Sequence, residues 1–256
     1  MSKPRQKNVE KFVGEKIVGF HQARLARIQN INLHDVLKKK NPYLFRAKNL
    51  LTSHELIASI LEAFVSSSEE ELFGEFLEEI AIYVSQQSYG GRKSSAAGID
   101  LEFDRQGIRY IVAVKSGPAW GNSGQYKALE RCFRDATKVL RQSQSSKHVQ
   151  AILGICYGKQ RTTDRGLYQK ITGQNFWEFI SGNENLYTDL IEPIGREAAR
   201  HFEMYMEEKN KLYNRFTKEF LDEFCGASGV IDWEKLVAFN SGNKNPSTRP
   251  LRHRKP

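Results

Sequence analysis

Asp100 and Lys115 are the two residues whose types and spacing point most directly to chemistry. They lie in two apolar-rich runs, 99–103 and 109–115, and the turn 104–107 between these runs predicts a β-hairpin. Because side chains alternate across a strand, Asp100 and Lys115 can meet near one end of this hairpin. A carboxylate can hold a hard divalent cation, and a neighbouring lysine can position or deprotonate water or stabilise a charged phosphate. The pair suits metal-assisted phosphodiester hydrolysis; the plainer alternative is a surface hairpin with ordinary charged residues.

The elements around this hairpin predict an α/β core with a mixed sheet. After the hairpin, residues 125–141 have the apolar spacing of a helix, and the run 149–157 indicates a buried strand. Before it, we expect helices over residues 52–64 and 66–85, the second beginning at three serines followed by three glutamates. The order helix, strand, strand, helix, strand predicts a mixed α/β fold with helical additions at both ends.

Helical patterns occupy both ends of the chain. Residues 9–40 have apolar side chains at helical spacing, and Asn41-Pro42 interrupts the pattern. The helices expected after the core span residues 176–180, 197–224 and 233–239. The predicted domains are a basic helical region 1–65, a catalytic core 66–185, a helical region 186–242 and a basic flexible tail 243–256.

The net charge of +9 conceals an uneven distribution. Residues 1–50 and 91–170 each carry a net charge of +9, whereas residues 51–90 carry −8 and residues 171–242 carry −6. A basic block beside a carboxylate block indicates a polyanionic partner and a site that also needs anions to hold metal. The alternative is that basic segments only aid solubility.

The hairpin and the residues after it resemble the PD-(D/E)xK nuclease signature. The resemblance rests on Gly98-Ile-Asp100 and on residues 110–125, YIVAVKSGPAWGNSGQ. More narrowly, the chain is similar to type II restriction endonucleases of the PmeII-like group, which are related to enzymes that cut GGNCC-type sites. Supporting stretches are KNPYLFRAK (40–48), LFGEFL (72–77), GQNFWEFISG (173–182) and IDWEK (231–235).

The resemblance assigns the motif aspartate to Asp100 and the motif lysine to Lys115, but Ala113 stands where the pattern has an acidic residue. Three interpretations are open. The carboxylate has moved to Glu130 on the following helix, one residue beyond the family's usual spacing; it comes from Glu78 on the acidic helix; or Ala113 is an inactivating change. We favour a moved carboxylate, because a small residue at position 113 leaves room for a side chain that reaches in.

The resemblance implies a type II site-specific deoxyribonuclease that uses Mg²⁺, held by Asp100 with Glu130 or Glu78. It would cut both strands of a short palindromic, GC-rich, GGNCC-like site and leave 5′-phosphate ends. The implied partners are double-stranded DNA and a second copy of the chain, because a palindrome matches a two-fold dimer. The expected DNA-contacting residues are Arg92, Lys93, Asn122, Ser123, Gln125, Lys159 and Arg161.

Two other functions stay open. One is a catalytically impaired, sequence-specific DNA-binding protein on a nuclease fold, which Ala113 favours. The other is a nicking or repair nuclease.

Composition limits the setting in which the protein works. Three cysteines without a CxxC pair fit a reducing compartment, and the apolar runs are too short to span a bilayer. The first residues contain no apolar segment of the kind found in secretory signals. We therefore expect a cytoplasmic protein with no membrane partner.

Overall fold

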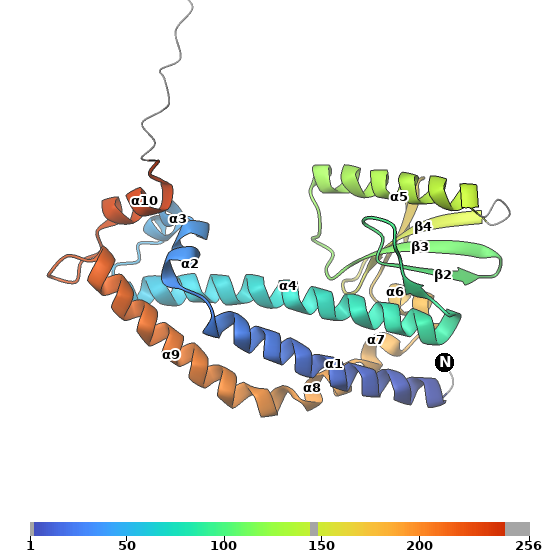
Figure 1. Ribbon diagram of the computed structural model, residues 1–256, viewed down its shortest axis with the longest axis horizontal. Coiled ribbons are helices and arrows are strands. Elements are labelled where there is room, and N and C mark those ends of the chain that lie inside the picture. The colour runs from blue at the N-terminus through green and yellow to red at the C-terminus, as the bar shows by residue number, and fades with distance from the viewer. Residues whose placement is uncertain (1–2, 144–147, 244–256) are drawn as a thin grey trace, which may run out of the picture. The chain divides into compact units, whose positions relative to one another are not determined.

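A computed structural model describes residues 3–143 and 148–243 of the chain (Figure 1). These residues form two compact units, each made from stretches that are far apart in the sequence. The first unit holds the described residues up to Arg24 together with Ser68–Met204, and the second holds Leu25–Ser67 and the described residues from Tyr205 onward.

Six strands of the described chain form one mixed sheet, which lies in the first unit. The strand order is β1-β2-β3-β4-β6-β5; β3, β4 and β6 are parallel, and the other neighbours are antiparallel. The predicted mixed α/β fold is thereby confirmed. The bounds are β1 (Arg92–Lys93), β2 (Leu101–Arg105), β3 (Ile108–Lys115), β4 (His148–Ile155), β5 (Thr163–Asp164) and β6 (Tyr168–Thr172).

Strands β2 and β3 form the predicted hairpin. Leu101 pairs with Val112, and the backbone N–H of Asp100 donates to the carbonyl of Val112 at 2.9 Å. This register places Asp100 beside the last residues of β3. Alternation along β3 then sends Val114 into the apolar cluster on one face of the sheet and Ala113 into the cluster on the other face.

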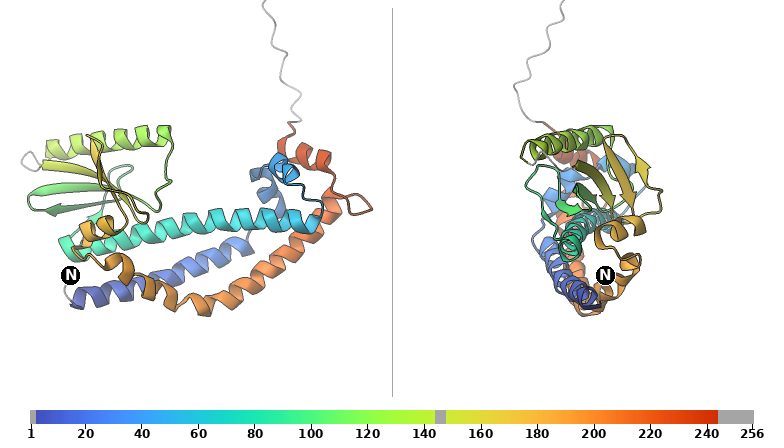
Figure 2. Two further views of the ribbon diagram at one scale, coloured as in Figure 1. Left: turned by 180° about the vertical axis from the view of Figure 1, so that it is seen from behind. Right: turned by 90° about the vertical axis from the view of Figure 1, so that its right-hand side faces the viewer.

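Helices cover both faces of this sheet, as Figures 1 and 2 show. Helix α5 (Ser123–Ser143) covers one face and buries Leu129 and Phe133 against the Ala113 side. Helices α4 (Ser53–Tyr89) and α6 (Gln174–Ser181) cover the other face. Helix α1 (Lys3–Gln29) packs on α4, where the rings of Phe12 and Tyr83 stack with centroids 3.9 Å apart. Two short helices follow α6: α7 (Leu186–Asp189) and α8 (Ile191–Arg196).

The second unit is helical. Helix α9 (Ala198–Phe224) supplies its core with Phe216, Phe220 and Phe224, which recur every four residues and are all buried. The start of α4 carries a capping box: the N–H of Glu55 donates to the hydroxyl of Thr52, and the N–H of Thr52 donates to the carboxylate of Glu55, both at 3.2 Å. The short helices are α2 (Leu33–Lys39), α3 (Pro42–Ala47) and α10 (Trp233–Ser241).

The predicted helices 52–64 and 66–85 form a single helix, α4, so the predicted start at the three serines is wrong. The hydroxyl of Ser67 donates to the carbonyl of Ala63 at 2.8 Å, four residues earlier. A serine that makes this bond stays within a continuous helix and does not cap a new one.

The pattern over residues 9–40 also divides differently from the expectation. Helix α1 ends at Gln29, and α2 begins after Asn32, whose side chain accepts the N–H of Asp35 at 2.9 Å. The Asn41-Pro42 pair begins another helix, α3, since the Asn41 side chain accepts the N–H of Tyr43 at 3.0 Å. The helices expected at 125–141, 176–180, 197–224 and 233–239 are confirmed as α5, α6, α9 and α10.

The basic tail predicted for 243–256 lies outside the described residues apart from Asn243. Within the described parts of the chain, no helix is long and apolar enough to span a bilayer. The three cysteines are free thiols.

The packing of β4 against α6 allows a test of the core. A methyl group on Gly154 would lie 2.1 Å from the ring of Phe176, which is fully buried. Gly154→Ala should therefore destabilise the protein by about 1–3 kcal/mol, because the core has no space for the added carbon. Urea denaturation measures the change.

The matched control is Gly14→Ala on α1, where an added Cβ meets nothing within 4 Å. This change should be neutral or stabilise the helix by up to about 1 kcal/mol. Equal stability of the two variants would contradict the packing described for Gly154.

Candidate active site

Asp100 and Lys115 meet at one end of the hairpin, as the spacing predicts. The Lys115 Nζ lies 3.7 Å from Asp100 Oδ2, and their side chains are 26% and 17% exposed, respectively. The backbone N–H of Val114 donates to the same carboxylate oxygen at 2.6 Å. The aspartate is therefore anchored to the strand that ends in the lysine, and both groups stay open to a ligand from solvent.

The residues after β3 and β4 enclose the lysine. The Lys115 ammonium lies 5.5 Å from the centre of the Trp120 ring, within the range of a cation–π contact. The Lys115 carbonyl accepts the N–H of Cys156 at 2.9 Å, and burial strongly raises the pKa of that cysteine thiol. A buried thiol with a raised pKa is inert, so Cys156 is a packing residue here.

Glu78 on α4 lies within electrostatic reach of this pair. Its pKa is raised, first by burial and then by the negative charge of Asp100, while Lys93 and Lys115 oppose the rise. Its Oε1 lies 3.7 Å from the Lys93 ammonium. One turn earlier, Gly74 lies close to the residue after Lys115, because a Cβ on Gly74 would lie 3.7 Å from the Ser116 side chain. Glu78 is therefore the candidate second carboxylate, coupled electrostatically to Asp100.

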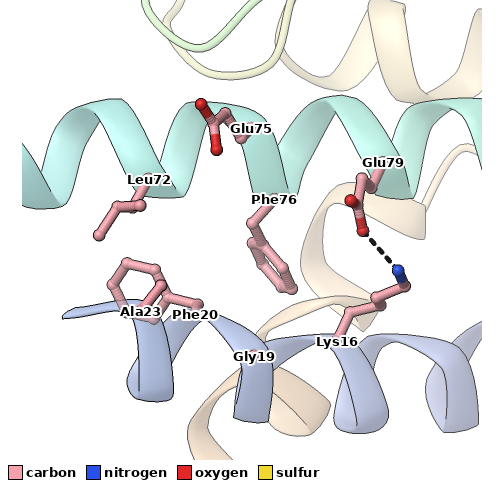
Figure 3. Close-up of a pocket in the computed structure, with 8 residues that line it drawn as sticks. All are labelled: Lys16, Gly19, Phe20, Ala23, Leu72, Glu75, Phe76 and Glu79. Carbon is pink, nitrogen blue, oxygen red and sulfur yellow. Dashed lines mark ion pairs between the residues drawn. The ribbon is translucent and has the colours of Figure 1, made fainter. Parts of the chain in front are cut away.

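Helix α4 directs its acidic residues to different sides. Glu79, adjacent to Glu78 in sequence, faces α1 and forms an ion pair with Lys16 at 2.8 Å (Figure 3). This ion pair lines a pocket of about 230 Å³ between α1 and α4, together with Phe20 and Phe76. The helical turn of about 100° per residue thus separates Glu78, which faces the hairpin, from Glu79, which faces α1.

Glu130, the other candidate second carboxylate, is directed elsewhere. It pairs with Arg134 one turn along α5 at 3.3 Å, and its charge contributes to the raised pKa of Tyr168 on β6, whose main cause is burial. Cys132 lies on the side of α5 that faces the start of the hairpin, because a Cβ on Gly98 would lie 2.7 Å from the Cys132 sulfur. Within the described chain, Glu130 contacts neither Asp100 nor Lys115.

Ala113 provides no opening for a side chain from α5. It is fully buried in the cluster that contains Leu129 and Phe133. The space that we expected beside a small residue is therefore filled by the apolar face of the helix.

The expected DNA-contacting residues of the helix start have structural partners. Asn122 and Gln125 form a capping box at the start of α5: the Asn122 side chain accepts the N–H of Gln125 at 3.0 Å, and the Gln125 side chain accepts the N–H of Asn122 at 2.9 Å. Ser123, the first residue of α5, is exposed. These residues orient the helix that follows the Lys115 loop.

The other expected DNA contacts fall into two pairs. Arg92 binds Glu102 through its guanidinium at 2.7 Å, and Lys93 lies beside Glu78. Lys159 and Arg161 are exposed in the segment between β4 and β5 and have no ion pair among the described residues. The first pair belongs to the edge of the candidate site, and the second is free to meet a ligand.

One exposed aromatic residue beside the site was not among the sequence candidates. Tyr157 is 57% exposed, and its N–H donates to the Ser116 carbonyl at 3.2 Å. A Cβ on Gly117 would lie 2.4 Å from its hydroxyl oxygen, so the glycine permits this contact. The glycine after Lys115-Ser116 was the available signal, but a glycine alone does not identify the side chain that approaches it.

The described residues contain no cluster of three or more side chains of the kinds that bind metals. The candidate site instead contains the carboxylates of Asp100 and Glu78 and the ammonium of Lys115, and all three side chains are partly exposed. Mg²⁺ is commonly bound by one or two carboxylates together with substrate phosphates and water. Asp100 and Glu78 therefore fit the protein's share of such a site.

A family model described as "Type II restriction endonuclease EcoO109I" matches residues 7–202, which is well over half of the chain. The matched segment includes Glu78, Asp100, Lys115 and Glu130. No curated protein matches the chain.

The raised pKa of Glu78 predicts a cost to stability. Because the folded state disfavours the ionised carboxylate, the cost is full above the folded pKa and disappears below the pKa of the unfolded chain. Glu78→Gln should therefore raise the melting temperature at about pH 8, and the gain should shrink as the pH falls through the raised pKa. Glu75→Gln, an exposed acidic position on the same helix, serves as the control and should show no such gain. A gain that is independent of pH would contradict the electrostatic origin of the effect.

Proposed function

The chain belongs to the type II restriction endonuclease EcoO109I family, and we propose that Asp100, Lys115 and Glu78 form the catalytic centre with which it cuts double-stranded DNA. Enzymes of this family are site-specific nucleases, hydrolases that act on DNA. The observation that carries the proposal is the meeting of Asp100 and Lys115 at the end of a rigid hairpin, with Glu78 beside them.

Mg²⁺ is the cofactor that we propose, with Asp100 and Glu78 as its protein ligands. The Val114 N–H occupies one oxygen of Asp100, and no hydrogen bond to the other oxygen is found among the described residues. Burial is the main cause of the raised pKa of Glu78, and the negative charge of Asp100 adds to it; a divalent cation would relieve this second contribution. When bound, the metal supplies an activated water and offsets charge on the phosphate.

Lys115 is the third group of the proposed catalytic centre. Its ammonium lies 3.7 Å from the Asp100 carboxylate and 5.5 Å from the centre of the Trp120 ring, and its side chain is 26% exposed. From there it can position the attacking water or donate a hydrogen bond to a phosphate oxygen whose charge grows in the transition state. Lys93, Lys159 and Arg161 would bind flanking phosphates.

The finer features of the proposal come from the sequence resemblance. We propose the PmeII-like group, a palindromic GGNCC-like site and cleavage that leaves 5′-phosphate ends. A two-fold dimer would present one site to each strand. We place the enzyme in the cytoplasm, where its free cysteines stay reduced.

Ala113 favours one rival function, a DNA-binding protein of this fold that no longer cuts. A plasmid digest separates the two. With MgCl₂ the protein should give discrete linear fragments that disappear with EDTA, and sequencing the ends should give one repeated site with 5′ phosphates. Salt-dependent binding without cleavage at any metal concentration would favour the rival, and nicked circles alone would indicate a nicking enzyme.

Paired substitutions test the catalytic residues. Lys115→Ala, Asp100→Ala and Glu78→Gln should each lower the cleavage rate by at least about 10²-fold, because each removes a group that acts on the reacting phosphate or its metal. Glu130→Gln is the matched control and should cut near the wild-type rate, since the ion pair that Glu130 forms among the described residues is with Arg134. Binding measured without metal should persist in Lys115→Ala. Loss of cleavage in Glu130→Gln together with full activity of Glu78→Gln would reverse the assignment.

A further inference from the structure

Helix α5 carries a row of five basic residues along one side. Their spacings of four, three, four and three residues place them on one face of an α-helix. All five are exposed, whereas Leu129, Phe133 and Ala136 on the opposite face are buried against the sheet. We call this row the α5 basic stripe; it consists of Lys127, Arg131, Arg134, Lys138 and Arg141.

Most of the positive charge in this stripe is uncompensated. Arg134 pairs with Glu130, but the other four cations have no ion pair within the described chain. Asp135 is the one further acidic residue on the helix, and it is exposed and has no ion pair with another described residue. By contrast, two exposed lysines on α1 have their charge compensated: Lys11 pairs with Glu15, and Lys16 pairs with Glu79. The α5 basic stripe therefore gathers exposed cationic side chains that neither pack in the core nor, apart from Arg134, form an ion pair with another described residue.

The position and length of the stripe suit a nucleic-acid backbone. Helix α5 begins eight residues after Lys115 and is fixed to that loop by its capping box. From Lys127 to Arg141 the axis rises by about 21 Å at 1.5 Å per residue. Measured along the DNA axis, where the phosphates of one strand recur about every 3.4 Å, that length spans about six phosphates.

We propose that the α5 basic stripe binds the phosphate backbone of the DNA that flanks the cleaved bond. This inference rests on the proposed function, since it concerns how the same substrate is held. Contacts of this kind position a protein on DNA without reading its bases. The stripe would therefore supply affinity that depends steeply on salt, while the chemistry stays with Asp100 and Lys115.

The test compares two triple variants of the full chain that lower the net charge equally. K127Q/R131Q/K138Q removes three cations of the stripe, and K7Q/K11Q/K16Q removes three exposed cations from α1 in the same unit. Glutamine is a good helix former, so both helices should persist, and circular dichroism checks this. Binding to a labelled duplex of mixed sequence is followed by fluorescence anisotropy in EDTA, over about 50 to 200 mM salt.

The stripe variant should bind at least about tenfold more weakly at low salt, and its log–log salt slope should fall by about 0.9 for each phosphate that the stripe no longer neutralises. The control variant should bind nearly as the wild type does, and it should cut at the wild-type rate. Equal binding by the two variants would overturn the stripe while leaving the proposed nuclease intact. A wild type that neither binds nor cuts DNA would overturn both. Polyglutamate serves as a probe for acidic protein partners. If the wild type bound polyglutamate and the stripe variant did not, while both bound DNA equally, the stripe would be assigned to an acidic protein and not to DNA.

Discussion

The hydrogen bond from the Val114 N–H to the Asp100 carboxylate is the contact on which the candidate site depends. The antiparallel pairing of β2 with β3 ends where Leu101 pairs with Val112. Beyond that point β2 offers no backbone acceptor to β3, and the Asp100 carboxylate accepts the Val114 N–H instead. Strand β3 is itself fixed on its other side by parallel pairing with β4 through Lys115. One bond therefore holds the aspartate, and the strand holds the lysine, in a single rigid frame.

Sequence reasoning located this frame because its causes are local. The alternation of residues, the turn and the apolar strand predict the hairpin, and the hairpin alone brings Asp100 to Lys115. The identity of the second carboxylate depends on tertiary structure. The resemblance suggested Glu130 by its spacing from Lys115 and Glu78 by its place on the acidic helix. The phase of α5 directs Glu130 toward Tyr168, while the close approach of Gly74 to Ser116 brings α4 to the site. The apolar periodicity of a single helix predicts neither the direction of Glu130 nor the approach of α4 to Ser116.

The same limit explains the errors in the helical regions. Three serines followed by glutamates favour a helix start, yet the Ser67 hydroxyl donates to the Ala63 carbonyl within the continuous helix α4. Strand β6 was not expected, since its five residues mix polar and apolar types and gain their place by pairing with β4. The combination of distant stretches into two units likewise follows from packing, which local patterns do not encode.

Ala113 is best understood from what covers it. Residues 111 and 113 project toward α5 and are fully buried in the apolar cluster that contains Leu129 and Phe133. An acidic side chain at 113 would have to place its charge beneath this apolar helix, at a large desolvation cost unless metal met it there. Glu78 reaches the same pair from the opposite layer, where Lys93 and Lys115 offset part of the cost of its burial. In this chain the apolar packing of α5 disfavours a carboxylate at position 113, whereas α4 brings Glu78 within electrostatic reach of Asp100.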